Sequence, residues 1–328
     1  MHRLTTLAAS VLALAGVAAA PASAEPLKVG YWSSGVSLGF GTFLQTKKFL
    51  EDQGFEVEYV TFPDVNAPTK ALVVGGIDFA IGASAGSSLS ATADGLPVSI
   101  ILATQVADLY FAVAPDSEIT SLSELAGKRV GGSPAGSATA SITAAILDQN
   151  YDIAPDDYEA VPGNDSLLAQ LLVQGEIDAA ALRSVSLALV ADANLKTIGS
   201  FREEWGKITG EDAAPVLGIG LIRDEWLEEH GEDAAARIVT AMRSAYEYGS
   251  AHKDEVATAL MEAANISQET ADAYAALWDD IYSVTMTPAT VESLRTEFEV
   301  FKSVGTVSGE FGADKVLTGP FEASKAAD

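Results

Sequence analysis

A ten-residue phrase occurs twice in this chain, 100 residues apart, and it limits the fold more than any other feature. The copies are ALVVGGIDFA at 71–80 and LLVQGEIDAA at 171–180, which are identical at six of ten positions. In each copy an apolar helix ends at a glycine, Gly75 or Gly175, because glycine tolerates a positive φ. Ile-Asp and a short buried strand follow, and a helical pattern then resumes. A repeated α-β-α unit predicts two similar lobes, each built on parallel-type sheet.

The rest of the chain continues this organisation, with apolar strands alternating with amphipathic helices. Strands are predicted at 28–32, 56–62, 98–104, 109–115, 128–133, 159–163, 195–201 and 216–222, and helices at 39–53, 86–94, 121–127, 137–150, 165–174 and 184–193. The strands at 109–115 and 216–222 are predicted to cross from one lobe to the other. Two such crossings predict a hinge with a cleft between the lobes. Ligands of open α/β sheets lie beyond the carboxyl ends of the strands, so the segments after Ala80 and Ala180 are the first place to expect a site.

The first 24 residues predict a signal peptide. Arg3 precedes an apolar segment too short for a membrane span, and residues 22–24 form an A-x-A cleavage site. The chain has no cysteine, so neither a lipid anchor nor a disulfide is expected. These features predict export, cleavage before Glu25 and a soluble periplasmic protein.

The predicted boundaries follow from these patterns. Residues 1–24 are the signal peptide, 25–108 the first part of lobe 1, 109–215 lobe 2, and 216–328 the return to lobe 1 with the C-terminal helices. Since the chain after residue 223 is almost wholly helical in pattern, its aromatic residues Trp226, Trp278 and Tyr282 are predicted to pack in the core rather than bind a cofactor.

The charge and the histidine content exclude several function classes. A formal net charge of −27 argues against nucleic acid or an anionic membrane as partner. His2 lies in the leader, and His230 and His252 lie in the C-terminal helices. Without cysteine or clustered histidine, neither a zinc site nor a nucleophilic triad is expected in the cleft. GGSPAG at 131–136 lacks the lysine of a P-loop, and no cofactor is expected.

Small hydroxyl residues and glycines recur where the predicted strands end and helices begin. Helix starts offer free N–H groups and partial positive charge, which suit an anion, and glycine lets a ligand approach the backbone. N-capping explains any one of these positions singly, whereas their recurrence favours ligand binding. The candidate ligand-binding residues are Trp32, Ser33, Ser34, Gly35, Asn66, Ala67, Ser84, Gln105, Gly136, Ser137, Ala138, Thr139, Arg183 and Ser184.

Arg183 is the most specific candidate, because it directly follows an apolar strand where a guanidinium is otherwise unfavourable. Two interpretations stand at this point. The guanidinium contacts a carboxylate or sulfonate of the ligand, or it pairs with Asp165 or Asp178 to stabilise the lobe. Asn66 and Gln105 are likewise placed either to bind a ligand or to complete a turn.

Several of these segments together resemble a known family. LKVGYW, FPDVNAPTKAL, G-x-IDFAIGAS, SLSELAGKRVGGSPAGSAT and the second L-V-x-G-x-IDAA are similar to the substrate-binding proteins of nitrate/sulfonate/taurine ABC importers. The resemblance implies a two-lobed periplasmic binding fold of type II. It also implies that residues 33–35, Asn66, Ala67 and Ser84 form binding loops and that the helix start at 136–139 receives an anionic head. The chain departs from sulfonate binders at Trp32 and at Leu182-Arg183-Ser184.

The resulting hypothesis is a non-enzymatic, monomeric binding protein that delivers a small organic anion or zwitterion, such as taurine or an alkanesulfonate, to a membrane permease. One alternative is a carrier for a carboxylate or for an aromatic or pyrimidine precursor, with Trp32 stacking on the ligand. An alternative from another class is an enzyme on the same fold, of the thiamine-pyrimidine or menaquinone pathway type, which the leader and the lack of reactive side chains in the cleft disfavour.

Overall fold

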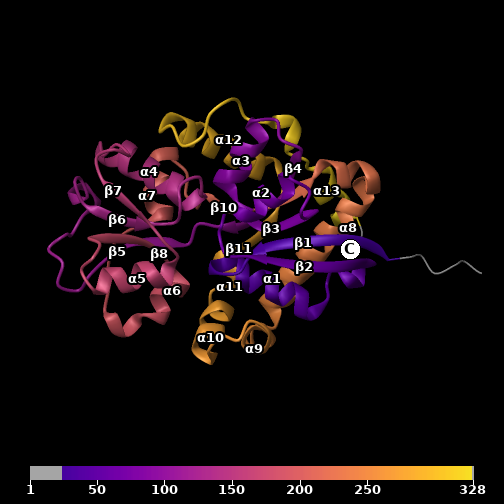
Figure 1. The fold of residues 1–328 in the computed structure, drawn as a ribbon, viewed down its shortest axis with the longest axis horizontal. Helices are drawn as coiled ribbons and strands as arrows, with labels where there is room; N and C mark the ends of the chain where they lie inside the picture. The colour runs from indigo at the N-terminus through magenta and orange to yellow at the C-terminus, as the bar shows by residue number, and fades with distance from the viewer. Residues whose placement is uncertain (1–23, 327–328) are drawn as a thin grey trace, which may run out of the picture.

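The computed structural model describes residues 24–326, so the predicted signal peptide lies outside the described residues except for Ala24. Two β-sheets flanked by helices lie side by side, which confirms the predicted α/β fold class (Figure 1). The six-stranded sheet has the order β11-β4-β10-β3-β1-β2, and the five-stranded sheet has the order β7-β6-β8-β5-β9. We call the six-stranded sheet with its helices lobe 1, and the five-stranded sheet with its helices lobe 2.

Lobe 1 combines the beginning and the end of the described chain. Its strands are β1 (Glu25–Trp32), β2 (Phe55–Phe62), β3 (Phe79–Ser84), β4 (Val98–Val106), β10 (Val216–Arg223) and β11 (Tyr282–Thr285). Its helices are α1 (Gly35–Lys47), α2 (Ala67–Val73), α3 (Ala85–Ala93), α8 (Asp224–Ala251), α9 (Lys253–Ala263), α10 (Gln268–Ala276), α11 (Trp278–Ile281), α12 (Pro288–Ser303) and α13 (Gly319–Lys325). Strands β2, β1 and β3 are parallel, whereas β10 runs antiparallel between β3 and β4.

Lobe 2 comes from the middle of the chain. Its strands are β5 (Leu109–Val113), β6 (Arg129–Gly132), β7 (Glu159–Pro162), β8 (Ala179–Arg183) and β9 (Lys196–Ser200), and its helices are α4 (Ala138–Tyr151), α5 (Asp165–Val173), α6 (Ser184–Leu189) and α7 (Phe201–Thr209). Strands β7, β6 and β8 are parallel, and β5 pairs antiparallel with β8 and β9. Both sheets therefore carry a parallel set extended by antiparallel strands.

The repeated phrase forms the same junction in both lobes, with an aspartate that fixes the strand beside its neighbour. In lobe 1 the Lys28 N–H donates to the Asp78 carboxylate at 2.9 Å, and the Asp78 N–H donates to the Lys28 carbonyl at 2.8 Å. In lobe 2 the Arg129 N–H donates to Asp178 at 2.7 Å, and the Asp178 N–H donates back at 2.8 Å. Each reciprocal pair holds a parallel strand pair in register, which gives the duplicated sequence a structural reason.

The main departures from the predicted elements are local. The helix predicted at 39–53 spans Gly35–Lys47, because Lys48 takes the left-handed conformation and ends it. The helix predicted at 121–127 is a single 3₁₀ turn, Leu122–Glu124. The C-terminal region also contains β11, which its helical pattern did not predict. Trp226, Trp278 and Tyr282 are fully buried among apolar neighbours, which confirms their predicted place in the core.

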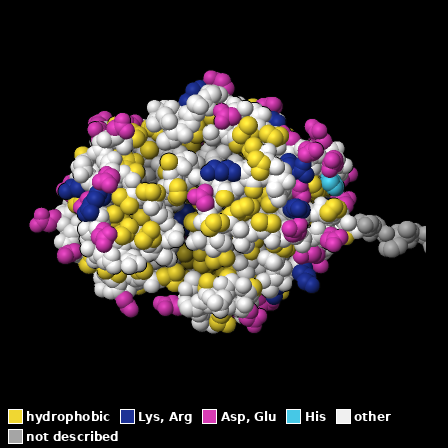
Figure 2. All heavy atoms as spheres, viewed as in Figure 1, with side chains coloured by type: hydrophobic (Ala, Val, Ile, Leu, Met, Phe, Trp, Pro, Cys, Tyr) yellow, Lys and Arg dark blue, Asp and Glu magenta, His cyan; other side chains and the backbone are white. Residues whose placement is uncertain are grey.

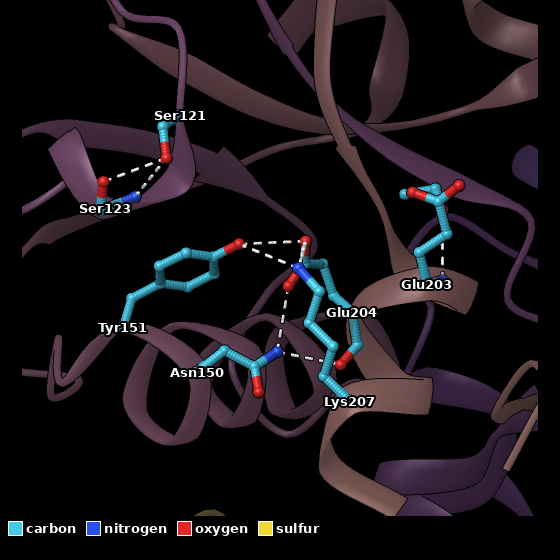
Figure 3. Close-up of polar contacts among 8 residues, drawn as sticks. Ser121, Ser123, Asn150, Tyr151, Glu203, Glu204 and Lys207 are labelled. Carbon is cyan, nitrogen blue, oxygen red and sulfur yellow. Dashed lines mark hydrogen bonds and ion pairs between the residues drawn. The ribbon is translucent and has the colours of Figure 1, made fainter. Parts of the chain in front are cut away.

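A hydrogen-bonded cluster around the buried Glu204 side chain ties helix α7 to helix α4 within lobe 2 (Figure 3). The Glu204 side chain is 5% exposed and accepts hydrogen bonds from Tyr151 at 3.0 Å, Asn150 at 3.0 Å and Lys207 at 2.7 Å. Hydrogen bonding to Glu204 raises the pKa of the Lys207 ammonium. Because these contacts join only α4 and α7, we assign the cluster to the stability of lobe 2.

The two crossings between the lobes lie side by side at residues 107–108 and 214–216. The Ala107 N–H donates to the Pro215 carbonyl at 2.9 Å, which joins one crossing to the other. The Val216 N–H donates to Oε1 of Glu297, a side chain from α12 that is 1% exposed. Oε2 of Glu297 has no hydrogen-bond partner. A buried carboxyl group therefore holds the start of the return strand.

The Glu297→Gln substitution is expected to remove part of the pH dependence of stability. Burial raises the pKa of Glu297 well above its usual value. Above the usual value of about 4.3, the folded state therefore binds more protons than the unfolded chain, and the free energy of unfolding falls with rising pH by at most about 1.4 kcal/mol per pH unit. Urea denaturation from pH 4 to 8 should show the variant gaining stability relative to the unsubstituted protein as the pH rises. Parallel pH profiles would contradict this assignment.

Candidate ligand-binding cleft between the lobes

The carboxyl ends of β1, β3 and β4 in lobe 1 face the end of β8 and the start of α4 in lobe 2. A cavity of about 10 Å³ lies between them, lined by Trp32, Val36, Ser37, Val65, Gly82, Ser84, Gln105, Ser137, Ala138, Thr139, Arg183 and Leu217. This volume accommodates about one water molecule, so the lobes meet in closed contact. A larger ligand requires the lobes to separate about the hinge. Hydrophobic side chains predominate in the hollow between the two halves of the molecule (Figure 2).

Two hydrogen bonds join the lobes directly beside this cavity. The Ala138 N–H, the first of helix α4, donates to Oγ of Ser84 at 2.8 Å. The Asn66 side chain donates from Nδ2 to the Ala135 carbonyl at 3.1 Å. Both bonds must break when the lobes open, so they contribute to the closed arrangement.

Three helices of at least nine residues begin at the cleft, two from lobe 1 and one from lobe 2. Helices α1 and α3 start at the N-caps Ser34 and Ser84, and neither side chain accepts a hydrogen bond from its own helix. Helix α4 is capped by Ser137, which accepts from the Ala140 N–H at 3.2 Å. Unpaired N–H groups at helix starts carry partial positive charge, so the cleft favours an anionic group.

Arg183 is the one charged side chain that lines the cleft cavity, and it is matched by a buried carboxylate. Its side chain is 3% exposed and forms an ion pair through Nη1 with Asp165, whose side chain is 8% exposed. Asp165 also accepts from the Arg183 N–H at 3.1 Å and from Ser186 at 2.8 Å. The structure thus selects the pairing of Arg183 with Asp165. This carboxylate is consequently engaged by three donors from lobe 2.

The Nε of the Arg183 guanidinium is a buried donor that is available to a further partner. This nitrogen has no hydrogen-bond partner, although the group is buried. The guanidinium carbon lies 5.3 Å from the centre of the Trp32 ring, which is a cation–π contact between the lobes. A hydrogen-bond acceptor of a ligand, placed at Nε, would therefore satisfy this buried donor on a guanidinium whose charge Asp165 already balances.

The start of α1 is held in place by two buried tyrosines from the C-terminal region. Tyr274 donates to the Gly35 carbonyl at 2.7 Å, and Tyr282 donates to the Val36 carbonyl at 2.6 Å. Burial raises the pKa of both phenols, so they remain protonated donors at neutral pH. The C-terminal segment thereby fixes one of the helix starts at the cleft.

The polar floor of the cleft on the side of lobe 1 is a short hydrogen-bonded chain. Gln105 donates from Nε2 to Ser37 at 3.4 Å, and Ser37 donates to the Gly82 carbonyl at 3.1 Å. A Cβ atom on Gly82 would lie 2.5 Å from the Gln105 amide nitrogen. Gly82 therefore lets the amide approach the backbone of β3.

The structure brings half of the sequence-predicted site residues to the cleft cavity. These are Trp32, Ser84, Gln105, Ser137, Ala138, Thr139 and Arg183. Asn66 and Gly136 line a neighbouring cavity instead. Ser33 is exposed and donates to the Phe62 carbonyl at 2.9 Å, while Ser34, Gly35 and Ala67 stand at helix starts outside the cavity lining.

Ser184 lies at the hinge rather than in the cleft. Its hydroxyl donates to Asp108, which lies in the crossing between β4 and β5, in a cavity of about 400 Å³. Burial raises the pKa of the Asp108 carboxyl, and the hydrogen bond from Ser184 opposes this shift. The structure thus places Ser184 against Asp108 at the hinge, and its contact with a ligand stays a prediction.

Five lining residues escaped the sequence analysis: Val36, Ser37, Val65, Gly82 and Leu217. Ser37 was missed because the first helix begins at Gly35, whereas it was predicted to begin at residue 39. Gly82 does lie in the segment after Ala80 where the site was expected. The sequence of β10 does not indicate that Leu217 lines the cleft. A strand that is buried at a hinge and a strand that is buried in a core both appear as a continuous apolar run. Among residues 24–326, no group of three or more His, Asp or Glu side chains is placed to hold a metal ion.

Comparisons with known proteins agree on the fold. The profile of the NMT1/THI5-like family matches residues 43–256. The alkanesulfonate-binding protein SsuA from Xanthomonas axonopodis pv. citri, bound to MOPS, is 17% identical with a TM-score of 0.74, and the match covers 92% of this chain and 100% of that one. No curated protein sequence matches this chain significantly.

Two further solved structures show how widely the fold is used. The periplasmic nitrate-binding protein NrtA from Synechocystis PCC 6803 is 13% identical with a TM-score of 0.70, over 94% of this chain and 90% of that one. The desulfurization enzyme DSZB is 13% identical with a TM-score of 0.63, over 93% of this chain and 100% of that one. At these identities the likeness establishes the fold and leaves ligand and activity open.

Proposed function

Because this chain belongs to the NMT1/THI5-like family and has the fold of periplasmic binding proteins, we propose that it is the solute-binding component of an ABC importer. In this role it captures a small organic anion or zwitterion in the cleft between its lobes. The ligand enters when the lobes separate, and its contacts with both lobes then favour a closed form with a wider cleft than the ligand-free one, which the membrane permease recognises.

The observation that carries this proposal is the convergence of helix starts from both lobes beside a buried guanidinium with a free donor. The cleft offers the starts of α1 and α3 from lobe 1 and of α4 from lobe 2, together with the Nε of Arg183, whose charge Asp165 already balances. Such a site supplies hydrogen bonds to an anion without requiring full neutralisation by side chains. A sulfonate or a carboxylate head satisfies this chemistry, and taurine or an alkanesulfonate is the leading class.

An aromatic or pyrimidine ligand remains a second candidate in the same binding class. Trp32 is 5% exposed at the cleft and offers the only aromatic ring in the cavity lining. The Arg183 guanidinium covers this ring in the closed form, so a stacking ligand must displace a cation–π contact. Because this contact would be lost, an aromatic ligand is a weaker candidate than an aliphatic anion.

Titration calorimetry of the mature protein tests the proposal directly. The panel contains taurine, ethanesulfonate, propionate, nitrate and an aminopyrimidine. We expect saturable binding of at least one sulfonate or carboxylate. Ligand at 100 times its dissociation constant should also stabilise the folded protein by about 2.7 kcal/mol. Absence of saturable binding across the panel would contradict the proposal.

An enzyme is the alternative from another class, since DSZB has a similar fold. The cavity lining contains hydroxyls, one amide and one paired arginine, but no histidine, carboxylate or thiol that could act as a general base or nucleophile. Incubating each bound ligand with the protein and recovering it chemically unchanged would support a carrier. Conversion of the ligand would favour the enzyme.

Export to the periplasm is the corresponding localisation. Within residues 24–326 there is no helix with the length and apolar character needed to span a bilayer. Acidic side chains are scattered over the visible face, without one charged patch (Figure 2). Cell fractionation with mass determination should recover a periplasmic monomer that begins at Glu25, and an unprocessed cytoplasmic chain would contradict this localisation.

A further inference from the structure

A second cavity, which we call the outer pocket, lies directly beside the cleft. It has a volume of about 410 Å³ and lies between α2 and α3 of lobe 1, where residues 135–136 of lobe 2 cover one side. Asn66, Thr69, Val73, Ser87, Ser90 and Leu96 are among its lining residues. The outer pocket thus has the size of an ordinary small-molecule site, whereas the closed cleft does not.

The same three chain segments separate the two cavities. Val65 lines the cleft and Asn66 lines the outer pocket; Ser84 lines the cleft and Gly86 the outer pocket. In lobe 2, likewise, Gly136 lines the outer pocket, and the residue after it lines the cleft. The Asn66–Ala135 hydrogen bond bridges the lobes at this boundary. Separation of the lobes breaks that bond and joins the two spaces.

Asn66 supplies an independent sign of a ligand. The residue is 7% exposed, its Nδ2 is used in the bridge to lobe 2, and its Oδ1 has no hydrogen-bond partner. A buried acceptor without a donor is unfavourable, so a donor group of a ligand would be stabilised there. The only charged side chains lining the pocket, Lys70 and Asp94, are exposed and opposite in sign. The pocket therefore suits an uncharged group.

We propose that the outer pocket receives the tail of the ligand whose anionic head occupies the cleft. The ligand class is then an organic anion that carries an uncharged, partly apolar tail with an N–H or O–H donor near its head. This inference rests on the proposed function and deepens it, because it favours an extended ligand over an inorganic anion or a short alkanesulfonate.

Matched pairs of probes with the same head test this inference. The sulfonate pair is ethanesulfonate and N-butyryltaurine, and the carboxylate pair is propionate and N-butyryl-β-alanine. The protein should bind the long member of a pair at least about tenfold more tightly than the short one. Equal affinity within both pairs would overturn the inference.

A chemical block of the outer pocket gives the decisive comparison. The chain has no cysteine, so the Ser90→Cys variant contains one thiol, which benzyl methanethiosulfonate modifies selectively. The adduct should weaken binding of the long probe about tenfold or more and change the short probe by less than about twofold. The matched control is Ser123→Cys, an exposed serine of lobe 2 that lines neither cavity, where the adduct should change neither affinity.

The outcomes separate the two levels of the proposal. If the adduct at position 90 leaves the long probe unaffected, or weakens both probes equally, the tail site is wrong and the proposed function stands. If no probe of either pair binds to the unmodified protein, the anion-binding function fails and this inference fails with it.

Discussion

Replacing Gly86 by alanine is expected to keep the lobes from closing and to lower ligand affinity by about ten- to one-hundredfold, which corresponds to about 1.4 to 2.7 kcal/mol. Gly86 lies in the first turn of α3, where lobe 1 meets lobe 2. A Cβ atom there would lie 2.8 Å from the Ser137 carbonyl carbon and 2.9 Å from the Ala138 nitrogen. These are backbone atoms of lobe 2, which cannot rotate away, so the lobes themselves must separate.

The effect should fall on binding and not on folding. Alanine is favoured over glycine inside a helix by about 1 kcal/mol, so the variant should unfold at an equal or higher denaturant concentration. Titration calorimetry with a short ligand and small-angle X-ray scattering should report weaker binding and a more open shape. Gly132→Ala is the matched control, since a Cβ atom there meets nothing within 4 Å. Similar affinities of both variants would refute the closure contact.

Asp165→Asn is expected to cost about 3 to 5 kcal/mol of folding stability, because it removes the counter-charge of a buried guanidinium. Arg183 and Asp165 are 3% and 8% exposed, so water cannot replace the lost partner. The asparagine keeps the size of the side chain and can still accept from the Arg183 N–H. The substitution therefore tests the charge of Asp165 separately from its size and from its hydrogen bond to the backbone. Urea denaturation at neutral pH measures the loss.

The repeated aspartate of lobe 2 supplies the control for this prediction. Asp178 also accepts a backbone N–H and pairs with an arginine, Arg129, but these side chains are 31% and 42% exposed. Asp178→Asn should therefore cost about 1 kcal/mol or less. The double substitution Arg183→Met with Asp165→Leu should recover much of the stability lost in Asp165→Asn while still impairing anion binding. Equal costs for the two single asparagine variants would show that Arg183 finds another partner.

The local patterns of the sequence account for most of the fold. The glycine-terminated helices and the alternating strands predict the β-α order of both lobes, since each signal lies within one turn or one strand. Strand β11 was missed because its four residues lie between helices and pair only with distant β4. The starts of α3 and α4 were predicted to within one residue, because serine and glycine after an apolar strand mark a strand-to-helix turn, whereas α1 begins four residues before its predicted start.

By itself, the sequence determined that two α/β lobes place helix starts and one arginine at the ends of their strands. Only the tertiary structure decided that Arg183 pairs with Asp165, that Ser84 accepts from the Ala138 N–H, and that Asn66 separates the cleft from the outer pocket. The physical reason is sequence distance. Helix and strand signals depend on neighbours a few residues apart, whereas each of these contacts joins residues at least 18 positions apart and depends on how sheets and lobes pack together.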